Sequence, residues 1–352
     1  MRSLATFCFA FTMFFVSCVV QADNAFTHRK DVQHFMNYMV NKHGFNKQQL
    51  VQIFNEVQLQ PQIIESMDKP FEKKNWDVYK QLFLTPQRVQ GGIEFWKTNQ
   101  AALAKAEKYY GVPANIIVAI LGIETLYGKN QGNYRVLDAL STLAFNYPKR
   151  SEFFSKELAE YLLLCREHHV SPTQYLGSYA GAMGKPQFMP SSYRYYAADF
   201  SGNTKKDLMN DDEAVIASVA NYFHKHGWKL NQSIAQPAKV VGMKFKRINS
   251  DYKTAAYSPK ELAAAGITPL TTTNQPQKVG LITLMTETGS EYWLAYPNFY
   301  VITRYNTSPQ YALAVYLLSQ RIKNQWTSSA LRDKKFAASQ ALSSALKDSR
   351  EA

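Results

Sequence analysis

The chain has 352 residues, enough for one large domain or for two to three smaller ones, each with its own core. Its hydrophobic and charged fractions, 46% and 19%, are typical of a soluble globular protein. The formal net charge of +13 suggests a polyanionic partner, such as a cell-wall polymer, an anionic lipid surface or nucleic acid; a basic chain without a specific partner is the alternative. The sequence has no compact Lys/Arg block and no nucleic-acid motif, so we exclude nucleic acid.

Residues 1–22 are predicted to be a signal peptide. Arg2 is the only charged residue before an apolar stretch, and Val20 and Ala22 are the small residues that a signal peptidase recognises. Cleavage after Ala22 removes the one charge of Arg2 and lowers the net charge from +13 to +12. No later segment reaches the roughly 20 apolar residues of a membrane helix. We therefore expect an exported, periplasmic protein.

Cys18 offers an alternative, which is a lipoprotein anchor. The preceding residues, Phe15-Val16-Ser17, match the usual Leu-Ala-Gly-like pattern poorly, and no polar tether follows. We therefore favour the soluble exported form. Its single remaining cysteine, Cys165, cannot form an intramolecular disulfide, so the stability of the mature chain depends on core packing.

From residue 23 to about 232, apolar residues recur at three and four positions, which predicts helices that include residues 34–45, 48–57 and 99–112. Gly111 is expected to close the third of these, and Pro113 suits the first turn of the next. That next helix, within residues 113–128, is apolar on all sides, which is typical of a helix buried in the middle of a domain.

Glu124 is the only carboxylate of that apolar helix, and it follows Ile117, Ile120 and Leu121 on one face. Gly128 is expected to end the helix, which places Glu124 in the last turns. Burial and the negative end of the helix dipole both raise the pKa of a carboxyl group. A protonated carboxyl group in a cleft has the property that a general acid needs. The alternative is a helix-end glutamate that points into water.

A glycine-rich run, Gly-Ser-Tyr-Ala-Gly-Ala-Met-Gly at residues 177–184, is followed by Lys-Pro-Gln-Phe-Met-Pro. Three glycines within eight residues expose backbone that a polymer can approach closely. Gln187 can donate and accept hydrogen bonds, as sugar amides and hydroxyls require. A simple glycine-rich turn is the alternative.

Two further segments are candidates for ligand binding. Lys149 and Arg150 follow aromatic residues in a turn, where they can hold carboxylates or form a solvated charge pair. Asp199, Ser201 and Asn203 resemble the start of a calcium loop, although the usual central glycine and the final glutamate are missing. The sequence shows no zinc-ligand spacing, no nucleophile elbow and no nucleotide fingerprint.

Between residues 233 and 304 the sequence becomes rich in β-branched and aromatic residues, broken by Gly, Pro and Asn. This predicts a small β-rich module inserted in a helical protein, with strands at 240–248, 279–287, 291–297 and 299–305. The segment that leaves the module, residues 305–311, contains Tyr305, Asn306 and Tyr311, and tyrosines suit sugar faces. Helical pattern resumes at residue 310 and runs to 325. The charged, Ala/Ser-rich end is expected to be a surface helix or a frayed tail.

Taken together, these motifs resemble the lytic transglycosylases of the membrane-bound B type, which cleave bacterial peptidoglycan. The resemblance spans about residues 76–319. It depends on the Gly-x-Glu-Thr helix at Glu124, on Phe-Asn-Tyr-Pro-Lys-Arg at 145–150, and on the glycine-rich run with Gln-Phe-Met-Pro-Ser-Ser-Tyr at 187–193.

The resemblance implies a mainly α (α+β) fold with a lysozyme-like helical core, a flanking helical domain and a small β module. We expect a helical domain of residues 23–108 plus 310–352, a catalytic core of 109–232 and the β-rich module of 233–304. Glu124 matches the family's single catalytic acid. The positions that match its glycan groove are Tyr79, Lys149, Arg150, Ser178, Gln187, Phe188, Tyr222, Tyr305, Asn306 and Tyr311. No cofactor is implied except calcium, which Ala214 places in doubt because some relatives have an acidic residue there.

The implied reaction is non-hydrolytic cleavage of the MurNAc–GlcNAc β-1,4 bond with closure of a 1,6-anhydro ring. We expect a monomer that binds peptidoglycan glycan strands, with other cell-wall enzymes as candidate further partners. One alternative is a hydrolytic muramidase that uses a second acid, such as Asp138 or Asp199. The other is a non-catalytic wall-binding or scaffolding protein.

Overall fold

A computed structural model of the chain describes residues 25–68, 74–202, 206–248, 254–271 and 278–351. The predicted signal peptide with Cys18, and Asn203 of the predicted calcium loop, lie outside these residues. The chain forms two compact units, of which the first ends at Glu56 and the second begins at Val57. Across the described ranges, none of the helices combines the length and the apolar character that crossing a membrane requires.

The first unit is a helical hairpin of α1 (Lys30–His43) and α2 (Lys47–Asn55). Gly44 ends α1 in the left-handed conformation at φ 67°, and the Asn46 side chain then caps α2 by accepting a hydrogen bond from the Gln49 amide at 3.1 Å. The ring centroids of Phe35 and Phe54 lie 5.8 Å apart at the packed face of the two helices. Both helices were predicted from their apolar periodicity.

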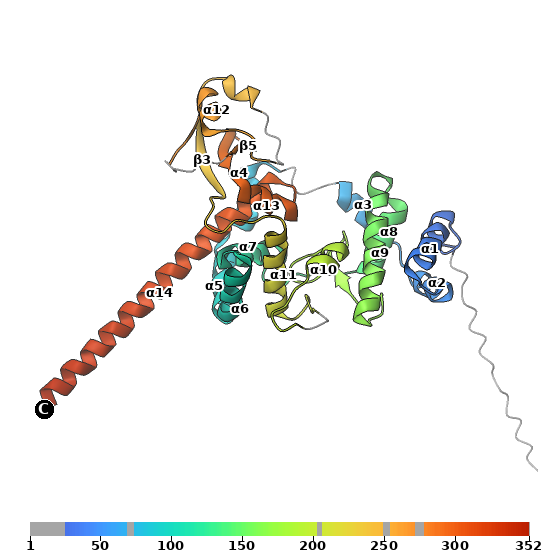
Figure 1. Cartoon of the computed structure of the whole chain (residues 1–352), viewed down its shortest axis with the longest axis horizontal. Coiled ribbons are helices and arrows are strands. Elements are labelled where there is room, and N and C mark those ends of the chain that lie inside the picture. Colours follow the sequence, from blue (N-terminus) through green and yellow to red (C-terminus); the bar gives the residue numbers. More distant parts are fainter. Residues whose placement is uncertain (1–24, 69–73, 203–205, 249–253, 272–277, 352) are drawn as a thin grey trace, which may run out of the picture. The chain divides into compact units, whose positions relative to one another are not determined.

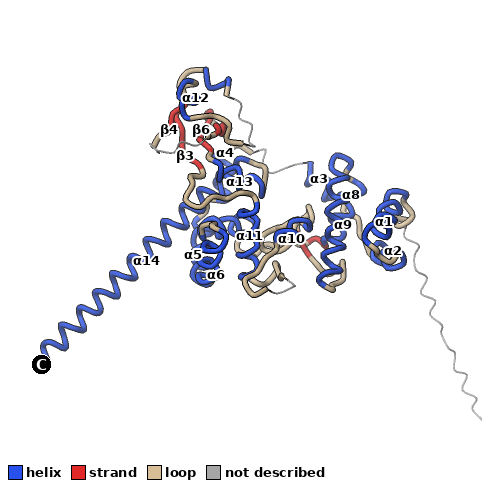
Figure 2. Tube along the Cα trace, viewed as in Figure 1, coloured by secondary structure: helices blue, strands red, loops and turns tan. Residues whose placement is uncertain are grey.

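The second unit is mostly helical (Figures 1 and 2). Figure 1 labels its helices, which are α3 (Pro61–Asp68), α4 (Trp76–Phe83), α5 (Pro86–Thr98), α6 (Gln100–Tyr110), α7 (Ala114–Thr125), α8 (Val136–Asn146), α9 (Ser151–His168), α10 (Pro190–Tyr196), α11 (Asp212–Lys225), α12 (Pro259–Ala264), α13 (Pro297–Tyr305) and α14 (Pro309–Glu351). The short 3-10 helix η2 (Pro148–Arg150) joins α8 to α9. The prediction of a mainly helical fold is confirmed.

Helix α7 lies at the centre of this unit, packed against α5, α6, α11 and α14. All of its residues are buried except Glu124, which is half-buried. Gly111 closes α6 at φ 72°, as predicted. The end of α7 differs from the prediction: the helix stops at Thr125, because Leu126 and Tyr127 adopt left-handed φ angles of 51° and 62°. Glu124 is therefore in the last turn.

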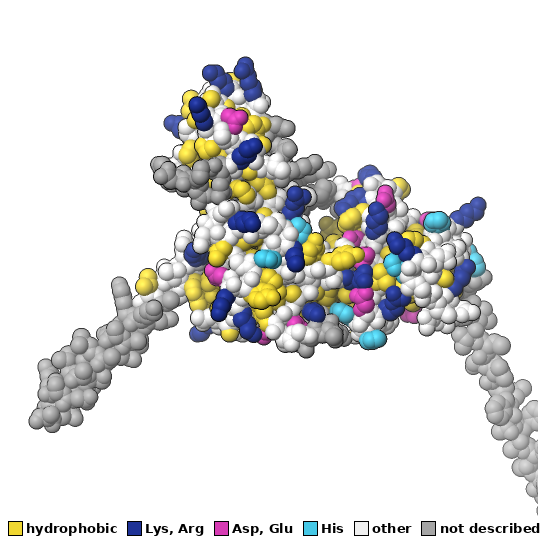
Figure 3. Space-filling model, in the orientation of Figure 1, with side chains coloured by type: hydrophobic (Ala, Val, Ile, Leu, Met, Phe, Trp, Pro, Cys, Tyr) yellow, Lys and Arg dark blue, Asp and Glu magenta, His cyan; other side chains and the backbone are white. Residues whose placement is uncertain are grey.

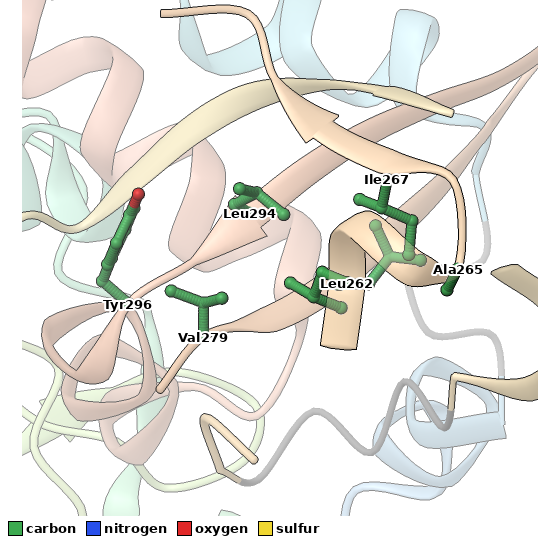
Figure 4. Close-up of a cluster of buried hydrophobic side chains, with 7 residues drawn as sticks. Leu262, Ala265, Ile267, Val279, Leu294 and Tyr296 are labelled. Carbon is green, nitrogen blue, oxygen red and sulfur yellow. The ribbon is translucent and has the colours of Figure 1, made fainter. Parts of the chain in front are cut away.

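The strands form two antiparallel sheets. A two-residue pair joins β1 (Tyr134–Arg135) to β2 (Leu176–Gly177). The second sheet has the order β4-β3-β6-β5, and its strands are β3 (Ala235–Val240), β4 (Ile267–Pro269), β5 (Gly280–Thr286) and β6 (Gly289–Ala295). This sheet and α12 share a small apolar core, shown in Figure 4, that contains Leu262, Ala265, Ile267, Val279, Leu281, Leu294 and Tyr296.

Two of the four predicted strands in this region are wrong. Residues 299–305 belong to α13, which begins with Pro297 at its first position and buries Phe299 and Ile302. β-branched and aromatic residues only favour a strand, and packing on both sides of a buried helix overrides that preference. The predicted strand at 240–248 ends at Val240 and is followed by the 3-10 helix η3 (Lys244–Arg247). The predicted domain boundaries at 108, 232 and 304 stay a prediction.

Candidate active site

The carboxylate at the end of α7 lies beside a tyrosine that comes 187 residues later in the chain. The Tyr311 hydroxyl, at the start of α14, donates a hydrogen bond to Glu124 Oε1. Tyr311 is buried, and burial together with the negative charge of Glu124 raises the pKa of its phenol well above the ordinary value. The same two causes raise the pKa of Tyr305. Both phenols therefore stay protonated at neutral pH and act as hydrogen-bond donors.

Aromatic rings from three segments meet next to this pair. The ring centroid of Tyr305 lies 5.7 Å from that of Phe188 and 5.0 Å from that of Tyr222, and its hydroxyl donates to the Pro186 carbonyl at 2.5 Å. Tyr222 donates to the carbonyl of Arg304 at 2.6 Å and stacks on His226 at 4.1 Å. These contacts join α11, the end of α13 and the segment after the glycine-rich run into one aromatic group.

A clamp that the sequence did not reveal fixes the end of α7. Arg88 Nη1 donates to the Gly122 carbonyl at 2.8 Å, and the Tyr127 hydroxyl donates to the Arg88 carbonyl at 2.5 Å. A Cβ on Gly122 would lie only 2.5 Å from the Tyr127 hydroxyl, so this position requires glycine. Arg88 is 34 residues from Gly122 and 39 from Tyr127, too far apart for any local spacing to predict the contacts.

The glycine-rich run folds back on itself. The Ser178 hydroxyl accepts hydrogen bonds from the amides of Ala180 and Ala182, at 3.3 and 3.1 Å. A Cβ on Gly177 would lie 2.3 Å from the Ala182 carbonyl oxygen, and one on Gly184 would lie 2.4 Å from the Leu208 carbonyl oxygen. These glycines therefore permit close approach within the protein, whereas we expected from the sequence that they permit approach by a polymer.

The remaining predicted groove residues lie in different surroundings. Gln187 donates to the carbonyls of Gln131 and Gly184, at 3.0 and 2.9 Å, so its amide holds two loops together. Asn306 Oδ1 accepts a hydrogen bond from the Ser308 amide at 2.9 Å, just before α14. Tyr79 is buried, and its ring stacks on that of Trp76 with the centroids 6.2 Å apart.

Lys149 and Arg150 form a separate group on η2. Lys149 Nζ lies 2.6 Å from Asp68 Oδ1, and this hydrogen bond raises the pKa of the lysine. The Arg150 guanidinium lies over the ring of Phe153, 4.3 Å from its centroid. Neither contact involves Glu124.

The acids considered as a second catalytic group make other contacts. Asp138 is buried and receives two hydrogen bonds from Arg135, at 2.7 and 2.9 Å, and one from the Gln58 amide at 2.9 Å. Asp199 Oδ1 accepts a hydrogen bond from the Gly202 amide at 2.7 Å. Among the described residues, no group of three or more Asp, Glu, His or Cys side chains could hold a metal ion. The calcium prediction depends partly on Asn203 and stays a prediction.

Residues 27–320 match the family described as "Transglycosylase SLT domain". The chain therefore belongs to this transglycosylase family, and it is an enzyme that acts on peptidoglycan as a lytic transglycosylase. It is 43% identical over 314 residues to the membrane-bound lytic murein transglycosylase B of Escherichia coli K12, an alignment that covers 86% of each chain.

Solved structures of similar proteins agree with this result. The soluble lytic transglycosylase SltB1 of Pseudomonas aeruginosa is 44% identical, with a TM-score of 0.77, over 83% of this chain and 98% of that one. The Escherichia coli transglycosylase Slt35 in complex with bulgecin A is 43% identical, with a TM-score of 0.79, over 86% of this chain and 95% of that one. Pseudomonas aeruginosa SltB3, solved with NAG-NAM-pentapeptide, is 29% identical with a TM-score of 0.71, over 83% of this chain and 79% of that one. The predicted lysozyme-like fold and the family are confirmed.

Proposed function

We propose that Glu124 alone supplies both the acid and the base for cleavage of the MurNAc–GlcNAc bond. The observation that supports this is the hydrogen bond from the neutral Tyr311 hydroxyl to a half-buried carboxylate in the last turn of a buried helix. In contrast, the Asp138 carboxylate accepts hydrogen bonds from the Arg135 guanidinium and from the Gln58 backbone amide. A carboxyl group that acts first as an acid and then as a base must exchange a proton readily, and the hydroxyl that Tyr311 donates to it is neutral.

In the first step, protonated Glu124 gives its proton to the glycosidic oxygen, and the bonding pair between C1 of MurNAc and that oxygen leaves with the GlcNAc. The MurNAc N-acetyl group stabilises the electron-deficient C1. In the second step, the Glu124 carboxylate takes the proton of the MurNAc 6-hydroxyl, whose oxygen attacks C1 and closes the anhydro ring. Glu124 ends protonated, so no second acid and no water are consumed. Tyr311 stabilises the carboxylate between the two steps.

The substrate is the glycan strand of peptidoglycan, with the half-buried ring of Tyr305 as the aromatic face of its groove and the buried rings of Phe188 and Tyr222 packed against it. Their rings lie within 6 Å of one another, and two of their hydroxyls are held by backbone carbonyls. Fixed aromatic faces suit the apolar sides of sugar rings. The NAG-NAM-pentapeptide bound by SltB3 supports a ligand of this chemistry.

We also propose a location and an assembly state for the protein from its sequence. The leader at residues 1–22 implies export to the periplasm, with a lipid anchor at Cys18 as the alternative. We propose a monomer without a cofactor, for which calcium near Asp199 is the alternative, and other cell-wall enzymes are candidates for further contacts.

The test is Glu124→Gln, assayed by the release of soluble muropeptides from isolated sacculi. We expect a loss of about a hundredfold to ten-thousandfold, because the variant can neither give nor take the proton. The matched control is Glu94→Gln, which changes an exposed glutamate on α5 and should keep full activity. Retention of most activity by Glu124→Gln would show that another group carries the chemistry. Binding of the wild-type protein to sacculi without release of muropeptides would support the scaffolding alternative.

A further inference from the structure

The sheet of β3–β6 presents an exposed tip that combines aliphatic and basic side chains. We define this tip as Val241, Met243, Lys244, Lys246 and Arg247, in the turn and the 3-10 helix η3 that follow β3. Val241 is 60% exposed and Met243 64% exposed, and the three basic side chains are exposed as well. Figure 3 shows basic side chains gathered over the part of the second unit that contains this sheet and α12.

Backbone contacts with the residue before β4 hold the start of the tip in place. The Val241 amide donates to the Gly266 carbonyl at 2.8 Å, which extends the pairing of β3 with β4 beyond the last strand residue. A Cβ on Gly266 would lie 2.2 Å from the Val241 carbonyl oxygen, so the turn can approach only a glycine there. Gly242, at φ 76°, then directs the chain outwards.

The same segment anchors itself with two apolar side chains. Phe245 and Ile248 pack against the small core of the sheet, and the ring centroid of Phe245 lies 5.4 Å from that of Tyr292. With these two residues turned inwards, the residues between and before them face outwards. The exposure of Val241 and Met243 is therefore a consequence of an ordered turn.

The charge of this segment is of one sign. From Lys239 to Ser250 the sequence contains four basic residues and no acidic one. A basic cluster attracts a polyanion, but the two candidate polyanions differ in what they offer to Val241 and Met243. A glycan is bound by ring faces and hydrogen-bonding groups, which aliphatic side chains do not provide. A lipid surface accepts aliphatic side chains below the headgroups while lysines and arginines contact the headgroups.

We propose that this tip docks the enzyme on an anionic lipid bilayer surface. Two aliphatic side chains are too few for the core of a stable protein–protein interface, which buries about 1,200 Å² or more in total. They are enough for shallow insertion that adds to electrostatic attraction, since membrane attachment of soluble domains commonly combines two weak signals. The docking is separate from the Glu124 site and does not depend on the proposed roles of the groove residues.

The test is cosedimentation of the chain from Asp23 onwards, which has no apolar leader, with vesicles of phosphatidylcholine alone or mixed with phosphatidylglycerol. The described residues begin at Ala25 and the family match begins at Thr27. The charge variant is Lys244→Glu with Lys246→Glu and Arg247→Glu, and the apolar variant is Val241→Ser with Met243→Ser. The control reverses the same number of exposed positive charges elsewhere, at three lysines: Lys97→Glu with Lys108→Glu and Lys225→Glu.

We expect the wild type and the control to bind the anionic vesicles and the charge variant to bind them about tenfold more weakly or worse. The apolar variant should also bind more weakly, although its charge is unchanged. Equal losses in the control and the charge variant would show that net charge alone is responsible and would overturn the proposal. Equal binding to both kinds of vesicle, or none to either, would also overturn it. Circular dichroism and thermal unfolding check the fold of each variant, so the result stands independently of catalytic activity.

Discussion

The last turn of α7 and the first turn of α8 each hold a carboxylate away from bulk solvent, and they hold it in different ways. Glu124 accepts a hydrogen bond from the neutral hydroxyl of Tyr311. Asp138 receives both arms of the Arg135 guanidinium and a backbone amide from Gln58. An ion pair with several donors fixes a carboxylate as a structural group, whereas a phenol donor permits proton exchange. Burial alone therefore does not make a carboxylate suitable for the proposed acid and base steps, because the buried Asp138 is held in an ion pair.

The largest effect on stability is expected at the structural acid. Asp138→Asn removes the negative charge of the buried carboxylate that the Arg135 guanidinium contacts, and it should lower the free energy of unfolding by about 3 kcal/mol. Urea denaturation measures this change, and the activity of each folded molecule should be retained. Asp31→Asn breaks an exposed Arg29–Asp31 pair in the first unit and is the matched control, expected to cost less than about 1 kcal/mol. A loss of activity in folded Asp138→Asn would assign this acid to the chemistry and would remove the contrast.

A smaller effect on rate is expected when the neutral donor is removed. Tyr311→Phe deletes the hydroxyl that stabilises the Glu124 carboxylate and should slow muropeptide release about tenfold to a hundredfold, because a hydrogen bond to a charged group contributes about 1.5–3 kcal/mol. A donated hydrogen bond favours the ionised form of a carboxyl group. Without the hydroxyl, Glu124 should stay protonated to a higher pH, so the alkaline pH at which activity is halved should move upwards in this variant.

Tyr305→Phe is the control for that experiment, because the Tyr305 hydroxyl donates to the neutral Pro186 carbonyl. It should slow release less than Tyr311→Phe does and should leave the pH profile in place. The same pH profile for all three proteins would contradict the role given to Tyr311.

The smallest effect concerns a second buried acid, Glu157 on α9. Burial raises the pKa of this carboxyl group above its ordinary value, although hydrogen bonds from the Ser191 amide and hydroxyl act in the opposite direction. The folded state therefore holds this proton more tightly than the unfolded state does, so the contribution of Glu157 to stability is greatest below the unfolded pKa. That contribution falls as the pH rises through the folded pKa.

Glu157→Gln should remove this loss of stability with rising pH, which is measured as the urea concentration at the unfolding midpoint at each pH. Glu152→Gln, on the same helix, is the control with the opposite sign, because the hydrogen bond from Lys156 lowers the pKa of Glu152. Its contribution is present above the unfolded pKa and is lost as the pH falls. Parallel pH profiles for both variants would contradict the account of Glu157.

The sequence predicted the parts of the site that local pattern encodes. Glu124 stands out because it is the only carboxylate in an apolar helix, and the periodicity of residues 34–45 and 48–57 predicted α1 and α2. The clamp of Arg88 and Tyr127 was missed because it joins residues 39 positions apart. Asp138 was a candidate second acid in the sequence because no local pattern shows its contact with the Gln58 amide, which lies 80 residues earlier.

Helix α13 shows a second limit of sequence patterns. Its β-branched and aromatic residues predicted a strand, yet Phe299 and Ile302 are buried in a helix that starts at a proline. A short apolar run fits either a buried strand or a buried helix, and only tertiary packing decides between them. In the same region, β5 and β6 were predicted correctly, because their cross-strand partners are neighbours in the chain.

In the mechanism that we propose, one carboxylate completes the reaction without water. The decisive experiment is digestion of isolated sacculi in heavy-oxygen water, followed at once by reduction and mass spectrometry of the muropeptides. We expect 1,6-anhydro ends, each lighter by one water than a reducing end, with no heavy oxygen incorporated, and no such products from Glu124→Gln. Reducing ends that carry heavy oxygen would show that water attacks C1, and they would contradict the single-carboxylate mechanism.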